Sequence, residues 1–173
     1  MGYYPSICVG NGYPQISYDD STNLPSNAIK FAYQDGSGWH TEIVELGGFN
    51  SGHSSLAFFG GYPRFSYYHG ADSGGNLKYA WKDGSGWHTE TVDYSLNSGV
   101  NSGLAIDSSG IPKIAYLDSS SRLKYAWKDS SGWHIEFVYD GPVSDCSLTL
   151  MGSGAPRISF HDGVTHNLRI AKK

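Results

Sequence analysis

The sequence predicts an all-β protein of the β-propeller class, with about four blades of four antiparallel strands each. Three observations predict this fold: a motif that returns about every 46 residues, short segments with period-two alternation, and an unusual composition. The 173 residues include 13 Tyr, 5 Trp and 23 Gly, and only 16% are charged. Aromatic residues favour strands and glycine favours the turns between them, whereas a disordered chain would lack the aromatic residues.

The repeat is clearest around the tryptophans. Residues 77–90 and 123–136 share the pattern Leu-Lys-Tyr-Ala-Trp-Lys-Asp-x-Ser-Gly-Trp-His-x-Glu, and residues 29–42 follow it closely. The second tryptophan of the pattern falls at Trp39, Trp87 and Trp133, which stand 48 and 46 residues apart. A fourth copy begins at Leu168 and runs to Lys173. Self-similarity at such a period is the signature of a repeat architecture.

Each repeat contains four strand signals in the same order. An apolar stretch such as 55–58 or 147–150 comes first, and a Gly-rich turn then ends in a proline. An alternating stretch such as 65–67 or 114–116 follows, and then the Leu-Lys-Tyr-Ala-Trp unit. An Asp-x-Ser-Gly turn leads to the last strand, Trp-His-x-Glu-x-Val. Four strands in about 46 residues match one propeller blade. We therefore predict one domain, 1–173, with blades at 5–50, 51–97 and 98–143 and a partial blade at 144–173.

Side-chain sizes along the second strand fit stacked blades. A small residue precedes an aromatic one in every copy, and small opposite large lets packed sheets interdigitate. Two alternative folds are excluded. No segment has the 3.6-residue apolar period of an α-solenoid, and a β-sandwich would not repeat one sequence four times. The pairs are Ser17-Tyr18, Ser66-Tyr67, Ala115-Tyr116 and Ser159-Phe160.

The fourth blade is expected to lack its outer strand, because nothing after Ala171 matches residues 133–136. An unpaired edge and an uncovered blade face favour association. We therefore expect a homo-oligomer that completes the ring, for example two chains with about eight blades. The alternative is that the sequence is a piece of a longer propeller.

Charge and hydropathy narrow the partners. The net charge of −4, with scattered Lys and Arg, argues against a nucleic-acid partner, and no apolar run is long enough for membrane insertion. The N-terminus shows no export signal, which leaves the localisation open. Cys8 and Cys146 fit no metal motif; ring closure could bring them together, but two small buried thiols are the better interpretation. We expect no metal, cofactor or catalytic residue.

The turn before the fourth strand carries a family resemblance. Asp83 precedes Trp87 there, and Asp129 precedes Trp133. The repeats resemble, over nearly the whole chain, those of bacterial β-propellers in the Asp-box and lectin-like group. The spacing is one residue shorter than in the Asp-box Ser-x-Asp-x-Gly-x-Thr-Trp, and its Ser and Thr do not match. The resemblance implies a structural Asp that accepts backbone N–H bonds and a Trp packed between blades.

Sialidases share such repeats but need three clustered arginines, a Tyr–Glu pair and an acid Asp. The chain has four arginines, of which Arg64 and Arg157 share one repeat position. Near-equivalent blades also oppose a unique catalytic centre. Hydrolase activity is therefore not expected.

Three sets of residues are candidates for a binding site. The first is His40, His88 and His134, each two residues before a Glu and thus on the same strand face. They could bind a metal or sugar hydroxyls, but a solvated stripe on the outermost strands is the favoured interpretation.

The second set ends the second strands, where carboxylates beside aromatic rings suit a sugar, although such residues are also ordinary in turns. It comprises Asp19 and Asp20, Tyr68 and His69, Asp118, and His161 and Asp162. The third set is aromatic: Trp81, Trp127, Trp87 and Trp133 are expected to pack in the core or to form a sugar-stacking wall between blades.

The function that fits these patterns best is a non-enzymatic, lectin-like module that binds glycans at repeated sites with multivalent avidity. The alternative is a protein-interaction or structural scaffold, natural or designed, with the same fold and no small-molecule pocket. Equivalent pockets between the blades would favour the lectin.

Overall fold

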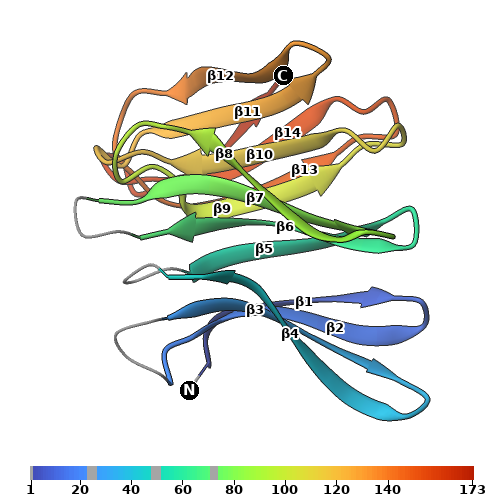
Figure 1. Ribbon diagram of the computed structural model, residues 1–173. Helices are drawn as coiled ribbons and strands as arrows, with labels where there is room; N and C mark the ends of the chain where they lie inside the picture. The colour runs from blue at the N-terminus through green and yellow to red at the C-terminus, as the bar shows by residue number, and fades with distance from the viewer. Residues whose placement is uncertain (1, 23–26, 48–51, 71–73) are drawn as a thin grey trace.

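The computed structural model describes residues 2–22, 27–47, 52–70 and 74–173, and these residues form strands and turns without a helix. The strands make four antiparallel sheets, each in chain order, as Figure 1 shows. The first sheet holds β1 (Gly2–Gly10), β2 (Tyr13–Asp20), β3 (Ala28–Asp35) and β4 (Gly38–Leu46). The second holds β5 (Gly52–Phe59), β6 (Tyr62–His69), β7 (Asn76–Asp83) and β8 (Gly86–Asp93). The third holds β9 (Val100–Ile106), β10 (Pro112–Leu117), β11 (Leu123–Asp129) and β12 (Gly132–Tyr139), and the fourth β13 (Val143–Leu150), β14 (Pro156–Asp162) and β15 (Leu168–Lys172).

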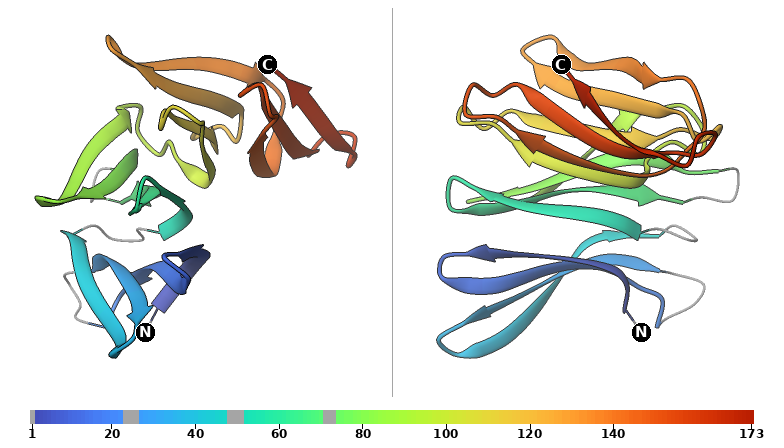
Figure 2. Two further views of the ribbon diagram at one scale, coloured as in Figure 1. Left: turned by 90° about the vertical axis from the view of Figure 1, so that its right-hand side faces the viewer. Right: turned by 180° about the vertical axis from the view of Figure 1, so that it is seen from behind.

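The four sheets are propeller blades set side by side in an arc. The first strand of each blade lies innermost, since β1, β5, β9 and β13 contact one another in that order. Figure 2 shows β4, β8 and β12 on the outside of the arc. The predicted all-β propeller, with a last blade lacking its outer strand, is therefore confirmed.

The core is divided among the three junctions between blades. At each junction, the third strand of one blade packs against the second and third strands of the next. Tyr79 meets Ile114 and Tyr116 at the second junction, and Phe31 meets Phe65 and Tyr67 at the first. Burial of these side chains stabilises by about 1.5–3 kcal/mol each, so blade stacking supplies most of the hydrophobic stabilisation.

The small residues of the second strands allow close approach at the innermost seam. Ser17 Oγ lies 2.8 Å from Ser54 Oγ, and Ser66 Oγ lies 2.8 Å from Ser102 Oγ. In the third blade, Ala115 replaces this serine and packs in an apolar cluster that includes Cys146. At these two seams a small side chain thus meets another small one, and the predicted packing of small residues against large ones stays a prediction.

Both cysteines are free thiols. Cys8 packs at the first junction and Cys146 at the third, each half-buried, so they are not paired with each other. Burial raises the pKa of Cys8 to about 11. None of the described segments is a helix that could cross a membrane.

Candidate functional site

A pocket of about 510 Å³ opens between the second and third blades. Strand pairing fixes its position, because the β5–β6, β7–β8, β9–β10 and β11–β12 turns all lie at one end of these sheets. The second blade contributes Tyr62, Arg64, Tyr79, Trp81, Lys82 and Asp83, and the third contributes Gly110, Ile111, Pro112, Lys128, Asp129 and Ser130.

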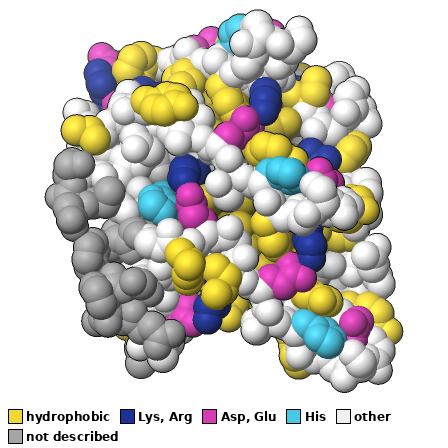
Figure 3. Space-filling view, viewed as in Figure 1, with side chains coloured by type: hydrophobic (Ala, Val, Ile, Leu, Met, Phe, Trp, Pro, Cys, Tyr) yellow, Lys and Arg dark blue, Asp and Glu magenta, His cyan; other side chains and the backbone are white. Residues whose placement is uncertain are grey.

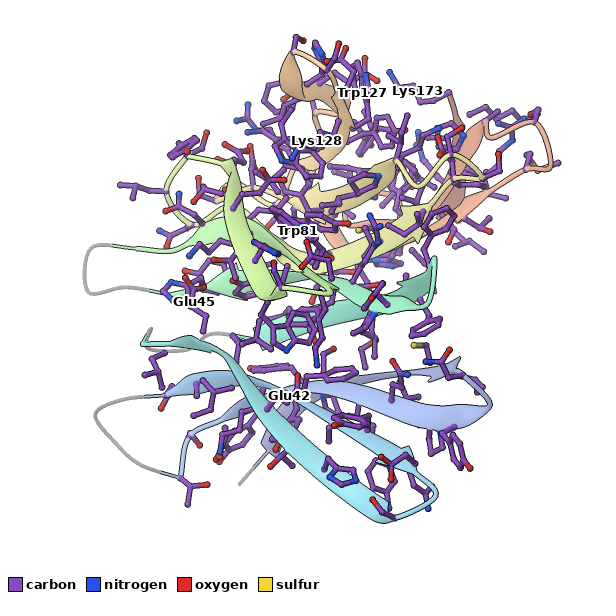
Figure 4. All side chains as sticks on the ribbon, turned by 45° about the vertical axis from the view of Figure 1, so that its right-hand side comes forward. Glu42, Glu45, Trp81, Trp127, Lys128 and Lys173 are labelled. Carbon is purple, nitrogen blue, oxygen red and sulfur yellow. The ribbon has the colours of Figure 1, made fainter. Side chains whose placement is uncertain are left out.

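Aromatic rings form the wall on the second blade. Alternation along β7 puts Tyr79 and Trp81 on one face, and register places His88 beside Trp81. The Tyr79 and Trp81 rings are nearly parallel, with centroids 5.7 Å apart, and the Trp81 and His88 centroids are 5.1 Å apart. From the opposite blade, the Lys128 ammonium lies 5.4 Å from the Trp81 ring centroid, and Figure 4 shows these two side chains across the junction.

Arg64 supplies hydrogen-bond donors without an ion-pair partner among the described residues. One guanidinium nitrogen donates to the Tyr79 hydroxyl and to the Gly110 carbonyl, both at 3.3 Å. The guanidinium also lies 5.3 Å from the Phe59 ring centroid. A guanidinium carries five N–H donors; the Nε–H of Arg64 is buried, so the other terminal nitrogen, Nη2, is the donor that remains for a ligand.

Gly110 closes the pocket beside Arg64. Its φ is +84°, a left-handed conformation that favours glycine, and an added Cβ would lie 2.7 Å from the Phe59 ring. This close approach brings the Gly110 carbonyl to Arg64.

Lys128 is held by a carboxylate from the preceding blade. Its ammonium donates to Glu90 Oε1 at 2.5 Å, and the Trp133 indole N–H donates to the same oxygen at 3.0 Å. The first junction repeats this arrangement with Lys82, Trp87 and Glu42, and Lys173 pairs with Glu136 at the third. Figure 3 shows basic, acidic and histidine side chains recurring along the stack of blades.

A smaller pocket of about 210 Å³ lies at the equivalent place between the first and second blades. Repeat alignment matches most of its lining to the larger pocket. In the smaller pocket, Gln15 occupies the repeat position that Arg64 has in the larger one. Tyr33 likewise corresponds to Trp81, and Lys82 corresponds to Lys128. Equivalent pockets therefore lie at the first and second junctions.

The three histidines of the first candidate set belong to the turns that border these pockets. In the second blade, the Ser85 N–H and hydroxyl both donate to Asp83 Oδ1 at 2.7 Å, and His88 Nε2 lies 3.0 Å from Asp83 Oδ2. These hydrogen bonds lower the pKa of Asp83 to about 2, the Ser85 hydroxyl having the largest effect. The same turn recurs around Asp35 and Asp129.

This Ser-His-Asp grouping lacks the geometry of a catalytic triad. Ser85 Oγ and Asp83 both approach the same histidine nitrogen, Nε2. A triad needs the carboxylate on one ring nitrogen and the nucleophile on the other. The turn carboxylate instead accepts a backbone N–H, as the resemblance implied.

The carboxylates of the second candidate set lie at the opposite end of the blades from these pockets. Asp20, Asp118 and Asp162 have protein donors, whereas the buried Oδ1 of Asp19 has no hydrogen-bond partner among the described residues. Asp118 Oδ1 accepts the N–H groups of Ser120 and Arg122, and its Oδ2 lies 2.7 Å from an Arg122 nitrogen. Burial alone would raise the pKa of Asp118, but these hydrogen bonds hold it below its usual value.

Asp162 and Asp20 are engaged similarly. Asp162 is fully buried and accepts hydrogen bonds from Val164, Thr165 and Tyr139, and Arg169 lies 2.7 Å away. Lys30 donates to Asp20 at 2.5 Å. The ligand-binding role of this set stays a prediction.

The aromatic and histidine members of that set are spread over different blades. Tyr68 donates its hydroxyl to Asn97 at 3.1 Å, and His69 Nε2 lies 3.6 Å from a Glu45 oxygen. His161 lies in the last blade, where its Nδ1 is 2.8 Å from the Ser144 hydroxyl.

Of the third set, Trp81 lines the larger pocket. Trp87 packs edge-on against Phe31 and Phe65, within the first junction. Trp133 meets Tyr79 at the second junction in the same way, and Trp127 stacks with Tyr125 and His134.

Three pocket residues were not predicted from the sequence: Arg64, Lys128 and Gly110. Arg64 and Lys128 occupy repeat positions that face each other across one junction. This could have been recognised from the sequence only if it were known which blades are neighbours and which of their faces are opposed. Within the described ranges, no group of three His, Cys, Asp or Glu side chains could hold a metal ion.

Comparison with known proteins supports the fold. No protein-family model and no curated protein sequence matches the chain. Among solved structures, it is similar to the Aleuria aurantia lectin, a mutant in complex with α-methyl-L-fucoside, with a TM-score of 0.64 and 16% identity over 98% of this chain and 56% of that one. It is also similar to a triple arginine-to-alanine mutant of AofleA from Arthrobotrys oligospora, with a TM-score of 0.64 and 12% identity over 96% of this chain and 52% of that one.

An endo-arabinase from Bacteroides thetaiotaomicron is also similar, with a TM-score of 0.60 and 10% identity over 98% of this chain and 74% of that one. The repeated blades and the similarity to these structures show that the chain has an all-β propeller fold. The fold is shared with propeller lectins and with hydrolases, and the chain spans about half of each lectin and three quarters of the arabinase.

Proposed function

We propose that this protein is a lectin-like module that binds saccharides in pockets between consecutive blades. The observation that carries the proposal is the 510 Å³ pocket between the second and third blades, together with its smaller equivalent one junction earlier. A volume of this size is in the range that holds a small ligand.

The lining has the chemistry that a sugar needs. Trp81 and Tyr62 present apolar surface on which the C–H face of a sugar ring packs. Arg64 and Lys128 donate hydrogen bonds to hydroxyl oxygens, and Asp83 and Asp129 accept them from hydroxyl hydrogens. Lys82 and Lys128 are already paired with Glu42 and Glu90, and the lining carboxylates Asp83 and Asp129 oppose the charge of Arg64, so the site favours a neutral saccharide over a strongly charged one.

Binding fits the residues better than glycoside hydrolysis does. The usual hydrolytic mechanism uses two carboxyl groups, about 5–5.5 or 6.5–9.5 Å apart, on either side of the scissile bond. Among their described residues, the innermost strands carry one carboxylate, Asp145. In the larger pocket, Asp83 and Asp129 are held by their own turns.

Recurrence of the pocket makes the proposed binding multivalent. Each site should be weak, in the mM to high μM range, or about 4–6 kcal/mol. Two sites on one rigid arc would engage neighbouring glycans of a surface and gain avidity.

A glycan array with labelled protein tests the proposal. We expect binding to a related group of neutral glycans, competed by free sugar at mM concentration. Calcium and EDTA should make no difference, because the carboxylates of Asp20, Asp118 and Asp162 are occupied by protein donors. Arg64→Gln should abolish the signal, whereas the matched Arg122→Gln, at the opposite end of the blades from the pocket, should keep it. A blank array would favour the scaffold alternative, and loss in EDTA would return attention to the second-strand carboxylates.

A further inference from the structure

The two end blades of the arc carry faces that the other blades keep covered. We call the face toward the preceding blade the leading face and the face toward the following blade the trailing face. In the second and third blades, the leading face is buried, with Leu56, Phe65 and Trp87 at one junction and Leu104, Ile114 and Trp133 at the next. The described residues leave the leading face of the first blade and the trailing face of the fourth uncovered, as Figure 2 shows for the ends of the arc.

The leading face of the first blade keeps the complete apolar pattern. Ile7 occupies the position of Leu56, and Ile16 that of Phe65. Trp39 occupies the position of Trp87 but is 54% exposed, and Ile7 is 67% exposed. An exposed cluster of this kind marks an interaction site.

The trailing face of the fourth blade has the matching pattern. Ile170 stands at the position of Phe31 and Tyr79, and Leu168 at that of Ile29 and Leu77. Ile170 is 63% exposed and Leu168 75%, although their counterparts are buried. The two uncovered faces therefore present the inner strands of a junction, without the fourth strand that contributes Val44 and Val92 at the first two junctions.

We propose that the leading face of one copy of this chain docks on the trailing face of a second copy, head to tail, as a fourth kind of blade junction. The occupant is a second copy because both halves of the junction lie on this chain. A contact between two different faces closes into a ring when its rotation allows.

Polar groups at the two faces agree with this docking. At the first junction, the Leu56 N–H donates to Ser6 Oγ at 3.0 Å, and at the second the Leu104 N–H donates to Ser55 Oγ at 3.0 Å. Ser147 holds the corresponding hydroxyl on the trailing face, ready for the N–H of Ile7 of the second copy.

The ion-pair positions agree as well. Lys82 and Lys128 each form an ion pair with a Glu on the fourth strand of the preceding blade. The fourth blade has no fourth strand among its described residues, so it offers no such Glu to a blade that docks on it. The first blade has Gln34 at this lysine position, so docking leaves no buried cation without a partner.

Docking would also assemble a further pocket that neither copy contains alone. Arg157, at the position of Arg64, would reach the Gly12 carbonyl of the second copy, as Arg64 reaches Gly110. Lys172 would stand for Trp81, and Tyr13 and Gln34 of the second copy would complete the lining. With lysine in place of the aromatic wall, this pocket would prefer a more anionic ligand than the pocket beside Trp81.

Light scattering after size exclusion, at tens of μM protein, tests the assembly. The wild-type chain should elute at a multiple of 18.8 kDa. Ile7→Glu and Ile170→Lys should each give a monomer with an unchanged far-ultraviolet spectrum. Leu96→Glu, an equally exposed residue in the loop after β8, should remain assembled.

Mixing the two monomeric variants provides the decisive arm. Glu at position 7 would meet Lys at position 170 across one interface, and the other interface would be wild type, so the mixture should assemble again at equal amounts. A wild-type mass of 18.8 kDa, variants that stay assembled, or a mixture that stays monomeric would each overturn the proposal. None of these readouts depends on sugar binding.

Discussion

Removal of the Glu42 carboxylate should destabilise the protein more than removal of Glu136, although the two residues share one repeat position. Both oxygens of Glu42 contact the Lys82 ammonium, at 2.6 and 2.7 Å, and the Trp87 indole N–H donates to Oε2 at 2.6 Å. Glu136 contacts Lys173 at 2.9 Å, with both side chains about a third exposed.

The magnitude follows from these contacts. A hydrogen bond from Trp87 to a charged acceptor contributes about 1.5 kcal/mol, and its loss leaves the indole N–H without its partner. The ion pair with Lys82 is about a quarter exposed and adds roughly 0.5–1 kcal/mol after solvent screening. Glu42→Ala should therefore cost about 2–3 kcal/mol, or roughly 4–12 °C in Tm, whereas Glu136→Ala should cost about 1 kcal/mol or less.

Urea unfolding followed by far-ultraviolet circular dichroism measures both free energies. Glu42→Gln should fall between the wild type and Glu42→Ala, because the amide oxygen still accepts the Trp87 hydrogen bond. Equal destabilisation by Glu42→Ala and Glu136→Ala would refute the assignment of a junction role to the Glu–Lys–Trp contact.

Three further predictions concern a buried carboxylate, a glycine with positive φ and a buried pair of serines. The pKa of Asp19 is raised to about 6, by burial first and by the neighbouring carboxylate second, so its contribution to stability is greatest near pH 4 and lost as the pH rises through 6. Asp19→Asn should thus be more stable than the wild type by about 1–3 kcal/mol at pH 7.5 but not at pH 4 in urea titrations, and equal differences at both pH values would contradict this. Gly110→Ala should displace Phe59, cost about 1–3 kcal/mol in thermal unfolding and weaken glycan binding; unchanged binding would show that the pocket tolerates a Cβ there. Ser66→Ala should cost about 1 kcal/mol or less, because the Ser102 hydroxyl still donates to the His53 carbonyl, whereas Ser102→Ala should cost about 1–2 kcal/mol because both the Ser66 hydroxyl and the His53 carbonyl lose it; equal losses would refute this.

The blades could be predicted because the repeat states the same strand pattern several times. Alternation along residues 77–81 placed Tyr79 and Trp81 on one face, and β7 has that arrangement. The observed strands are longer than the predicted cores, since β5 runs over Gly52–Phe59 where the apolar stretch covers 55–58. Periodicity identifies a strand, but backbone pairing extends it through polar residues.

The candidate pocket could be predicted only in part. Trp81 was expected to pack in the core, with a sugar-stacking wall between blades as the alternative, and it lines the larger pocket. The pocket also contains Arg64 from the second blade and Lys128 and Gly110 from the third. These residues lie together only because two particular faces of the adjacent blades are opposed. That choice is made by the packing of whole sheets, which no local pattern encodes. Asp118 looked equally suitable in sequence, but its turn already satisfies it.

The indole N–H signals of the 5 tryptophans, recorded by nuclear magnetic resonance during titration with a sugar selected on the array, test the central claim most directly. Single Trp→Phe substitutions assign each signal. We predict a saturable shift of the Trp81 signal, while the Trp39 signal, from the leading face of the first blade, stays unchanged. A saturable shift of Trp39 with no change at Trp81, or no shift of any indole at mM sugar, would contradict a saccharide site between the second and third blades.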